Sequence, residues 1–101
     1  MNMLRQHKTS SDPAVTKHMV LANKLGMHAR PAAMFVKTAS RFESEIIVEK
    51  DGETVDGKSI MGLMMLAAGY GSELKITAQG MDAEKAVVEI EKLLIAKFDE
   101  E

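Results

Sequence analysis

The stretch E-I-I-V-E-K-D-G-E-T-V-D-G, residues 45–57, places two β-prone runs on either side of an Asp-Gly pair. Ile46 to Val48 are β-branched, and side chains of this kind favour strands. Asp51-Gly52 between two such runs is a strong signal for a two-residue hairpin turn, because glycine adopts a positive φ at little cost. The stretch therefore predicts a β-hairpin with strands over 45–50 and 53–55.

Two further strands are predicted outside this hairpin. Residues 15–21 form a short, partly β-branched run of the kind that is typical of a strand. Residues 73–79 alternate in polarity, and Leu74, Ile76 and Ala78 share one side. This alternation predicts a strand with one buried face.

Three helices are predicted between and after the strands. Residues 29–41 carry apolar side chains at i, i+3, i+4 and i+7, which make one buried face. Ser59 is a candidate N-cap for a short helix over 60–66, and Asp82 is a candidate cap for a last helix over 82–98. The buried stripe of the last helix is expected to consist of Ala83, Ala86, Val87, Ile90, Leu93 and Leu94.

The predicted order of elements is βαββαβα, which indicates an α+β fold. A chain of 101 residues has the size of one domain. Its polar first segment predicts a flexible N-terminal leader over residues 1–14, followed by the domain over residues 15–101.

The composition excludes several classes of function. The chain has no cysteine and a formal net charge of −2, so disulfides, thiolate metal sites and nucleic-acid binding by bulk charge are not expected. No apolar run reaches the length of a membrane span, which predicts no membrane insertion. Together with the lack of cysteine, this favours a cytoplasmic protein.

The motif G-M-H-A-R-P-A, residues 26–32, predicts an anion site at the start of the first helix. With His28 as N-cap, Pro31 is tolerated in the first turn, where its missing N–H has no intrahelical partner. The N–H groups of Ala29 and Arg30 then stay free, and the guanidinium of Arg30 can form two hydrogen bonds to phosphate oxygens. Imidazole is a competent nucleophile near neutral pH, so covalent capture of a phosphoryl group is one hypothesis. A surface histidine that merely caps a helix is the plainer alternative.

Two surfaces near this motif are candidates for docking. Arg30, Lys37 and Arg41 share the polar face of the first helix, where they could contact an acidic partner or simply be solvated. Ile60, Met61 and Met64 cannot all be buried if the leucines of the short helix face the core, so they could form an adaptable apolar patch. A fully buried short helix is the alternative. No metal-ligand cluster is apparent, and His18 has no metal-like partner spacing.

The first motif, together with a second one, strongly resembles a known family. G-M-H-A-R-P-A resembles the active-site motif of HPr, the histidine-containing phosphocarrier family of the sugar phosphotransferase system. G-K-S-I-M-G-L-M, residues 57–64, resembles the regulatory serine motif of the same family. The resemblance covers about residues 16–97. It implies an open-faced β-sandwich, in which a four-stranded antiparallel sheet carries three helices on one face.

The resemblance also implies a function. His28 would accept a phosphoryl group from enzyme I, which takes it from phosphoenolpyruvate, and would pass it to an enzyme IIA partner. Arg30 and the amide of Ala29 would steady the group. Lys37, Ile60, Met61 and Met64 match docking positions, and Ser59 matches the serine that HPr kinase/phosphorylase modifies. The protein would be a monomeric carrier rather than an enzyme, and neither a cofactor nor a metal is expected.

Two competing functions are weaker. A regulatory relative would act in a phosphorelay or as a binding module controlled by phosphorylation of Ser59, without sugar transport. Such relatives often lose the histidine, and His28 is present here. A small hydrolase would need a substrate cavity and a second acid–base group, and the sequence indicates neither.

Overall fold

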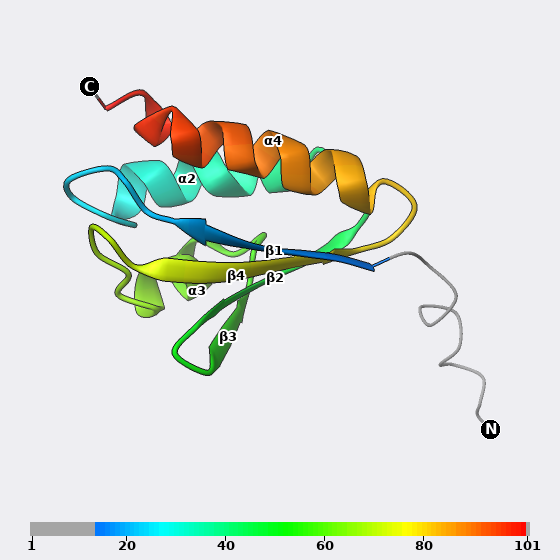
Figure 1. Ribbon diagram of the computed structural model, residues 1–101, viewed down its shortest axis with the longest axis horizontal. Helices are drawn as coiled ribbons and strands as arrows, with labels where there is room; N and C mark the ends of the chain where they lie inside the picture. Colours follow the sequence, from blue (N-terminus) through cyan, green and yellow to red (C-terminus); the bar gives the residue numbers. More distant parts are fainter. Residues whose placement is uncertain (1–13, 101) are drawn as a thin grey trace.

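The computed structural model describes residues 14–100, which form a four-stranded antiparallel sheet covered by helices (Figure 1). Neighbouring strands follow the order β1-β4-β2-β3, so the last strand of the chain lies between the first and the second. This is the predicted α+β fold with the order βαββαβα. The strands are β1 (Ala14–Val20), β2 (Glu45–Lys50), β3 (Glu53–Asp56) and β4 (Glu73–Gln79).

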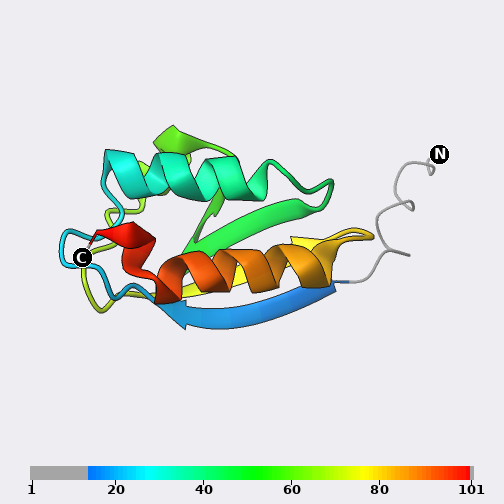
Figure 2. The same cartoon turned by 90° about the horizontal axis from the view of Figure 1, so that it is seen from above.

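Two long helices lie side by side across one face of the sheet (Figure 2). They are α2 (Ala29–Ala39) and α4 (Ala83–Ile95). The short helix α3 (Ile60–Met65) packs beside α2 and contacts β3. Within residues 14–100, the other face of the sheet carries no helix, which makes this part of the chain an open-faced sandwich (Figure 1).

Alternation along the strands explains which face the helices cover. Leu74, Ile76 and Ala78 of β4 are fully buried beneath α2 and α4, as the alternating pattern predicts. In the β2–β3 hairpin, Asp51 and Gly52 both have positive φ, 52° and 84°, which is the conformation that a type I′ turn requires. The prediction of the hairpin is therefore confirmed.

The ends of the helices differ from the sequence prediction. Helix α2 ends at Ala39 rather than residue 41, with Ser40 as C-cap. Helix α4 ends at Ile95 rather than Phe98, so the predicted end is wrong. Residues 97–99 form a short 3₁₀ turn, η1, in which all three have left-handed φ between 53° and 58°. This turn folds Phe98 back into the core, where its side chain is 1% exposed, and that burial offsets the backbone strain.

Asp82 occupies the N-cap position of α4, but its side chain does not cap that helix, so this part of the prediction is wrong. Its carboxylate instead accepts hydrogen bonds from the backbone N–H groups of Glu43 (2.9 Å) and Ser44 (3.0 Å) and from the Ser44 hydroxyl. The carboxylate therefore ties the start of α4 to the segment that precedes β2.

The N-terminal leader predicted over residues 1–14 lies outside the described residues, except for Ala14, which begins β1. Among the helices of residues 14–100, none is both long and apolar enough to cross a membrane.

Candidate functional site

His28 stands at the N-cap of α2, in extended conformation with φ −85° and ψ −171°, as predicted. Its carbonyl accepts the first helical hydrogen bond from Ala32 at 3.0 Å, while its side chain makes no capping bond. The N–H groups of Ala29 and Arg30 precede that bond and have no intrahelical acceptor. The imidazole side chain is 38% exposed, so an anion can approach both the ring and the open helix end.

A glycine and the loop after α3 hold His28 in this position. Gly26 has φ +71°, and a Cβ on it would lie 2.5 Å from the carbonyl oxygen of Ala68. The same carbonyl accepts a 2.8 Å hydrogen bond from the N–H of Met27, whose side chain is buried. The residue before His28 is thus fixed to a second loop, and the direction in which the chain enters α2 is determined.

A carboxylate from the end of the chain contacts the histidine ring. Nε2 of His28 lies 2.8 Å from Oε2 of Glu100. The side chain of Glu100 is 14% exposed, and its oxygen also accepts a 3.1 Å hydrogen bond from Nδ2 of Asn23. The hydrogen bond with His28 holds the pKa of Glu100 below its ordinary value, helped by Asn23 and by the positive charge of Arg30. Glu100 is therefore an ionised acceptor at neutral pH, and the ring nitrogen facing it carries the proton.

Sequence analysis did not identify Asn23 or Glu100. Glu100 lies 72 residues from His28 in the sequence and approaches it through the left-handed turn η1, for which no local pattern gives a signal. The side chain of Asn23 is fully buried beneath the loop, where its Nδ2 also donates to the carbonyl of Gly26 at 2.8 Å. The available sequence signal was a polar residue two positions after the predicted strand over 15–21.

The surroundings of His28 form a shallow pocket of about 380 Å³. Arg30 and Lys24 bring positive charge to it, Glu100 brings negative charge, and Leu25 adds an exposed apolar wall. Of the predicted site residues, His28 and Arg30 line this pocket, and Ala29 lies between them in the chain. The two cations can attract an anion, although Glu100 opposes binding close to Nε2.

The predicted docking residues lie on α2 and α3, which contact each other. Lys37 is exposed, and so are Ile60 (41%), Met61 (71%) and Met64 (42%). Met65, the last residue of α3, is also exposed, at 75%, and was not among the predicted docking residues. The exposure agrees with a docking surface, while the role of each side chain stays a prediction.

Ser59 is the N-cap of α3, as predicted, and its Oγ accepts a 3.0 Å hydrogen bond from the N–H of Gly62. Its regulatory role stays a prediction.

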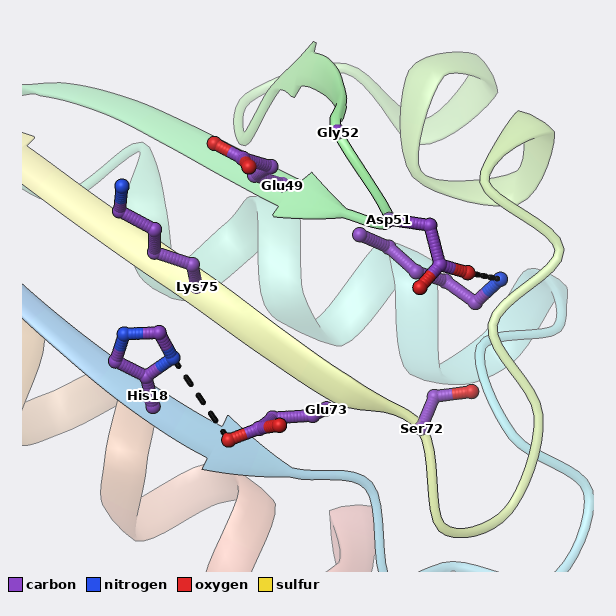
Figure 3. A pocket seen from close by; sticks show the side chains of 8 residues that line it. His18, Glu49, Asp51, Gly52, Ser72, Glu73 and Lys75 are labelled. Atoms are coloured by element: carbon purple, nitrogen blue, oxygen red, sulfur yellow. Dashed lines mark hydrogen bonds and ion pairs between the residues drawn. The ribbon is translucent and has the colours of Figure 1, made fainter.

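His18 lies away from this site, on the open face of the sheet (Figure 3). Its Nδ1 is 3.8 Å from Oε2 of Glu73, and both side chains are well exposed. They line a pocket of about 510 Å³ in which the acidic side chains of Glu49 and Asp51 face Lys75 and Lys50. Within residues 14–100, no group of three or more histidine or acidic side chains is arranged to hold a metal ion.

Comparison with known proteins defines the class. A family model described as the PTS HPr component phosphorylation site matches residues 15–96. The phosphocarrier protein HPr of Treponema pallidum is 48% identical over 87 residues, which are 86% of this chain and 99% of the relative. The HPr-like protein Crh of Halalkalibacterium halodurans is 47% identical, with the same coverage of both chains. A crystal structure of HPr from Thermoanaerobacter tengcongensis matches with a TM-score of 0.84 at 47% identity, covering 86% of this chain and 98% of that one.

The fold and the family match define a phosphocarrier, which is a carrier rather than a classical enzyme. The chain belongs to the HPr family of the phosphotransferase system.

Proposed function

We propose that His28 accepts a phosphoryl group from enzyme I, derived from phosphoenolpyruvate, and passes it to the histidine of an enzyme IIA domain. The observation that carries this proposal is the 2.8 Å contact between Nε2 of His28 and Glu100 at the open end of α2. Because the contact keeps the proton on Nε2, the lone pair of Nδ1 is free to attack phosphorus. His28 would thus carry the phosphoryl group on Nδ1.

The groups beside His28 suit the charge that develops during transfer. A phosphoryl group in flight spreads negative charge over its three equatorial oxygens. The free N–H groups of Ala29 and Arg30 and the positive end of the α2 dipole can stabilise that charge, and the guanidinium of Arg30 can close over it from the side. These donors are part of the fold before the reaction, so they require little reorganisation.

The face formed by α2 and α3 is the surface proposed to dock enzyme I and enzyme IIA. Lys37 would contact acidic side chains of the partner, and the patch of Ile60, Met61 and Met64 would be buried against apolar ones. Ser59, at the start of the apolar patch, would be the target of an HPr kinase/phosphorylase. A phosphate there would place about two negative charges in the docking surface and weaken acceptance at His28.

A labelling experiment tests the histidine assignment. The protein is incubated with enzyme I and labelled phosphoenolpyruvate, and the label is tested for lability in acid and stability in base. His28→Ala is expected to lose all labelling, whereas His18→Ala, which removes an exposed histidine on the open sheet face, is expected to label at the wild-type rate. Full labelling of His28→Ala would refute the carrier assignment for this residue.

A second experiment tests the regulatory proposal. Ser59→Asp adds a negative charge inside the docking patch and is expected to weaken binding to enzyme I about tenfold, as measured by calorimetry. Ser72→Asp adds the same charge beside the pocket on the open sheet face and serves as the control. Equal affinities of the two variants would remove Ser59 from the proposed regulation.

A regulatory role without sugar transport is the alternative function, and the similarity to HPr-like Crh proteins supports it. The two roles differ in whether phosphorylated His28 passes its group to an enzyme IIA domain. Loss of label from the carrier on addition of enzyme IIA supports transport, and its retention supports the regulatory role.

We further propose that the carrier acts in the cytoplasm as a monomer. Several related proteins form dimers, among them HPr from Thermoanaerobacter tengcongensis, whose dimer structure is 50% identical over 77% of this chain. Light scattering at micromolar concentration is the measurement that decides the oligomeric state.

A further inference from the structure

The sulfur of this chain lies in methionine alone. The sequence has nine methionines and no cysteine, so thioethers are the sulfur groups that a mild oxidant can reach. Susceptibility to such an oxidant follows exposure, which differs widely among the described methionines. Met19 and Met27 are 5% exposed, whereas the three methionines of α3 are 42% to 75% exposed, namely Met61, Met64 and Met65.

Helical spacing brings these three side chains to one side of α3. Met61 and Met65 are four residues apart, so they lie one above the other on the helix surface, and Met64 lies beside them. Leu63, the buried residue of the helix, points the opposite way into the core. The exposed side of α3 is therefore rich in thioethers, and two of them, Met61 and Met64, belong to the apolar patch proposed to dock enzyme I.

We propose that the exposed methionines of α3 are a reversible modification site, at which a peroxide converts thioethers to sulfoxides and thereby weakens the docking of enzyme I. The inference rests on the proposed function, because it concerns the surface proposed to dock that partner. It gives the same surface a redox input that is separate from phosphorylation at Ser59.

Oxygen transfer to sulfur requires no catalytic group of this protein. A lone pair of the sulfur attacks one oxygen of hydrogen peroxide, the O–O bond breaks, and its electron pair leaves with the second oxygen. The departing hydroxide takes the proton of the transferred oxygen and becomes water. Sulfur is thus oxidised by two electrons, and the peroxide is reduced by two. A methionine sulfoxide reductase reverses the change, because a dithiol is oxidised to a disulfide while the oxygen leaves as water.

A sulfoxide makes the patch polar without adding a net charge. Thioether sulfur is a weak acceptor that packs well against apolar side chains, whereas the oxygen of a sulfoxide needs a hydrogen-bond donor. Docking against an apolar partner surface would remove water from that oxygen and leave it unpaired. One buried, unpaired polar group of this kind lowers affinity about tenfold.

The fold is expected to survive this oxidation. Leu63 and Leu66 hold α3 against the core, and the exposed methionines of the helix lie outside the core cluster. Met27, whose backbone fixes the chain ahead of His28, is buried, so a peroxide reaches its sulfur slowly. Oxidation therefore changes the docking surface before it disturbs the histidine site.

The test compares the wild type with two leucine variants, because leucine keeps an apolar side chain of similar volume that peroxide does not oxidise. The first variant combines Met61→Leu, Met64→Leu and Met65→Leu. Met81→Leu is the matched control, since Met81 is 86% exposed but precedes α4, on which no docking residue is proposed. Each carrier is treated with dilute hydrogen peroxide, and catalase removes the excess. Calorimetry measures its affinity for enzyme I before and after treatment, and mass spectrometry of peptides locates the added oxygen.

In the wild type and in Met81→Leu, treatment is expected to add oxygen to the α3 methionines and to lower the affinity about tenfold. The triple variant is expected to keep its affinity. Methionine sulfoxide reductase with dithiothreitol is expected to restore the affinity of the oxidised wild type. Unchanged affinity of a wild type that carries oxygen on Met61 would overturn the proposal. An equal loss in the triple variant would also overturn it, since the effect would then come from another methionine, such as the half-buried Met34.

The failure of this inference is separable from the failure of the proposed function. If enzyme I labels His28 of the untreated protein and oxidation of Met61 leaves the affinity unchanged, the carrier role stands and the redox input is refuted. If enzyme I neither binds nor labels the untreated protein, the proposed function fails, and this inference fails with it. Circular dichroism spectra that match before and after treatment support a change confined to the surface. Spectra that differ would place the loss of affinity in unfolding and overturn the proposal.

Discussion

Helices α2 and α3 contact each other, yet their N-termini differ in how the first backbone N–H groups are satisfied. At α3, the Oγ of Ser59 accepts from the N–H of Gly62 at 3.0 Å and closes the end. At α2, His28 stands at the equivalent position and makes no capping bond. An internal cap and an external anion compete for the same donors, so the end without a cap is the one available to a ligand.

The difference also reflects how each helix is stabilised. Helix α3 has 6 residues, of which Leu63 alone is buried within its bounds, and a helix that short depends on its cap. Helix α2 has 11 residues and buries four of them, including Phe35 and Ala32. Packing of that face stabilises α2 sufficiently for its first turn to remain open. A functional helix end of this kind requires a well-packed helix behind it.

The largest effect on stability is expected from Gly26→Ala, which disturbs the loop that leads into the uncapped N-terminus of α2. The new Cβ would meet the carbonyl of Ala68 at 2.5 Å, and the residue would keep a strained φ of +71°. We expect a loss of about 3 kcal/mol in the free energy of unfolding, measured in urea. Gly52→Ala is the control, because it has φ +84° with nothing within 4 Å of the new Cβ, so strain without a clash should cost about 1 kcal/mol. Equal losses would mean that the contact with Ala68 is unimportant.

A smaller effect on stability is expected from Asp82→Ala at the start of α4. There the side chain neither caps its helix nor leaves the end open, but binds the segment before β2. The substitution removes three hydrogen bonds to Glu43 and Ser44 and should cost about 2 kcal/mol at pH 7. The Ser44 hydroxyl and then the Glu43 N–H hold the pKa of Asp82 below its ordinary 3.8, so the folded state binds its proton less tightly than the unfolded state. The stabilisation is therefore present above pH 4 and declines as the pH falls through the lowered value.

Denaturation in urea at several pH values measures this contribution. The difference in stability between the wild type and Asp82→Ala should shrink toward acid pH. A difference that is the same at pH 7 and at pH 2 would contradict the role of the carboxylate charge.

The smallest effect on stability is expected from changes to the N-cap residues themselves. One substitution removes the cap of α3, and another introduces a cap at α2. Ser59→Ala should cost about 1 kcal/mol through loss of the bond to Gly62. At the open end, His28→Ser is expected to be about 1 kcal/mol more stable than His28→Ala, because a serine there can cap the free N–H groups. Both His28 variants lose the contact with Glu100, so their difference isolates the cap. Equal stability of the two would show that the end of α2 cannot accept a cap.

The sequence was sufficient for the parts of the fold that local patterns determine. Alternation identified the buried side of β4, and Asp51-Gly52 identified the hairpin, because both depend on neighbours in the chain. Local reasoning also located the start of α2 at Ala29 and the exposure of the α3 methionines.

The parts that could not be predicted depend on distant contacts. Helical periodicity continues through Phe98, but burial of that ring against the core is better achieved by a left-handed turn, so α4 ends earlier. In the same way, Asp82 is attracted to two N–H groups 38 and 39 residues away rather than to its own helix. Glu100 and Asn23 meet at His28 only once the whole domain is assembled.

The position of β4 has a consequence for how the chain reaches this fold. Because β4 separates β1 from β2, the first two strands share no hydrogen bonds, and within the described sheet β1 pairs with the late strand alone, whereas β2 also pairs with β3. During synthesis, the β2–β3 hairpin is the piece of sheet that can form before residues 73–79 leave the ribosome. Refolding should accordingly wait on long loop closures around β4, and β1 should dock late.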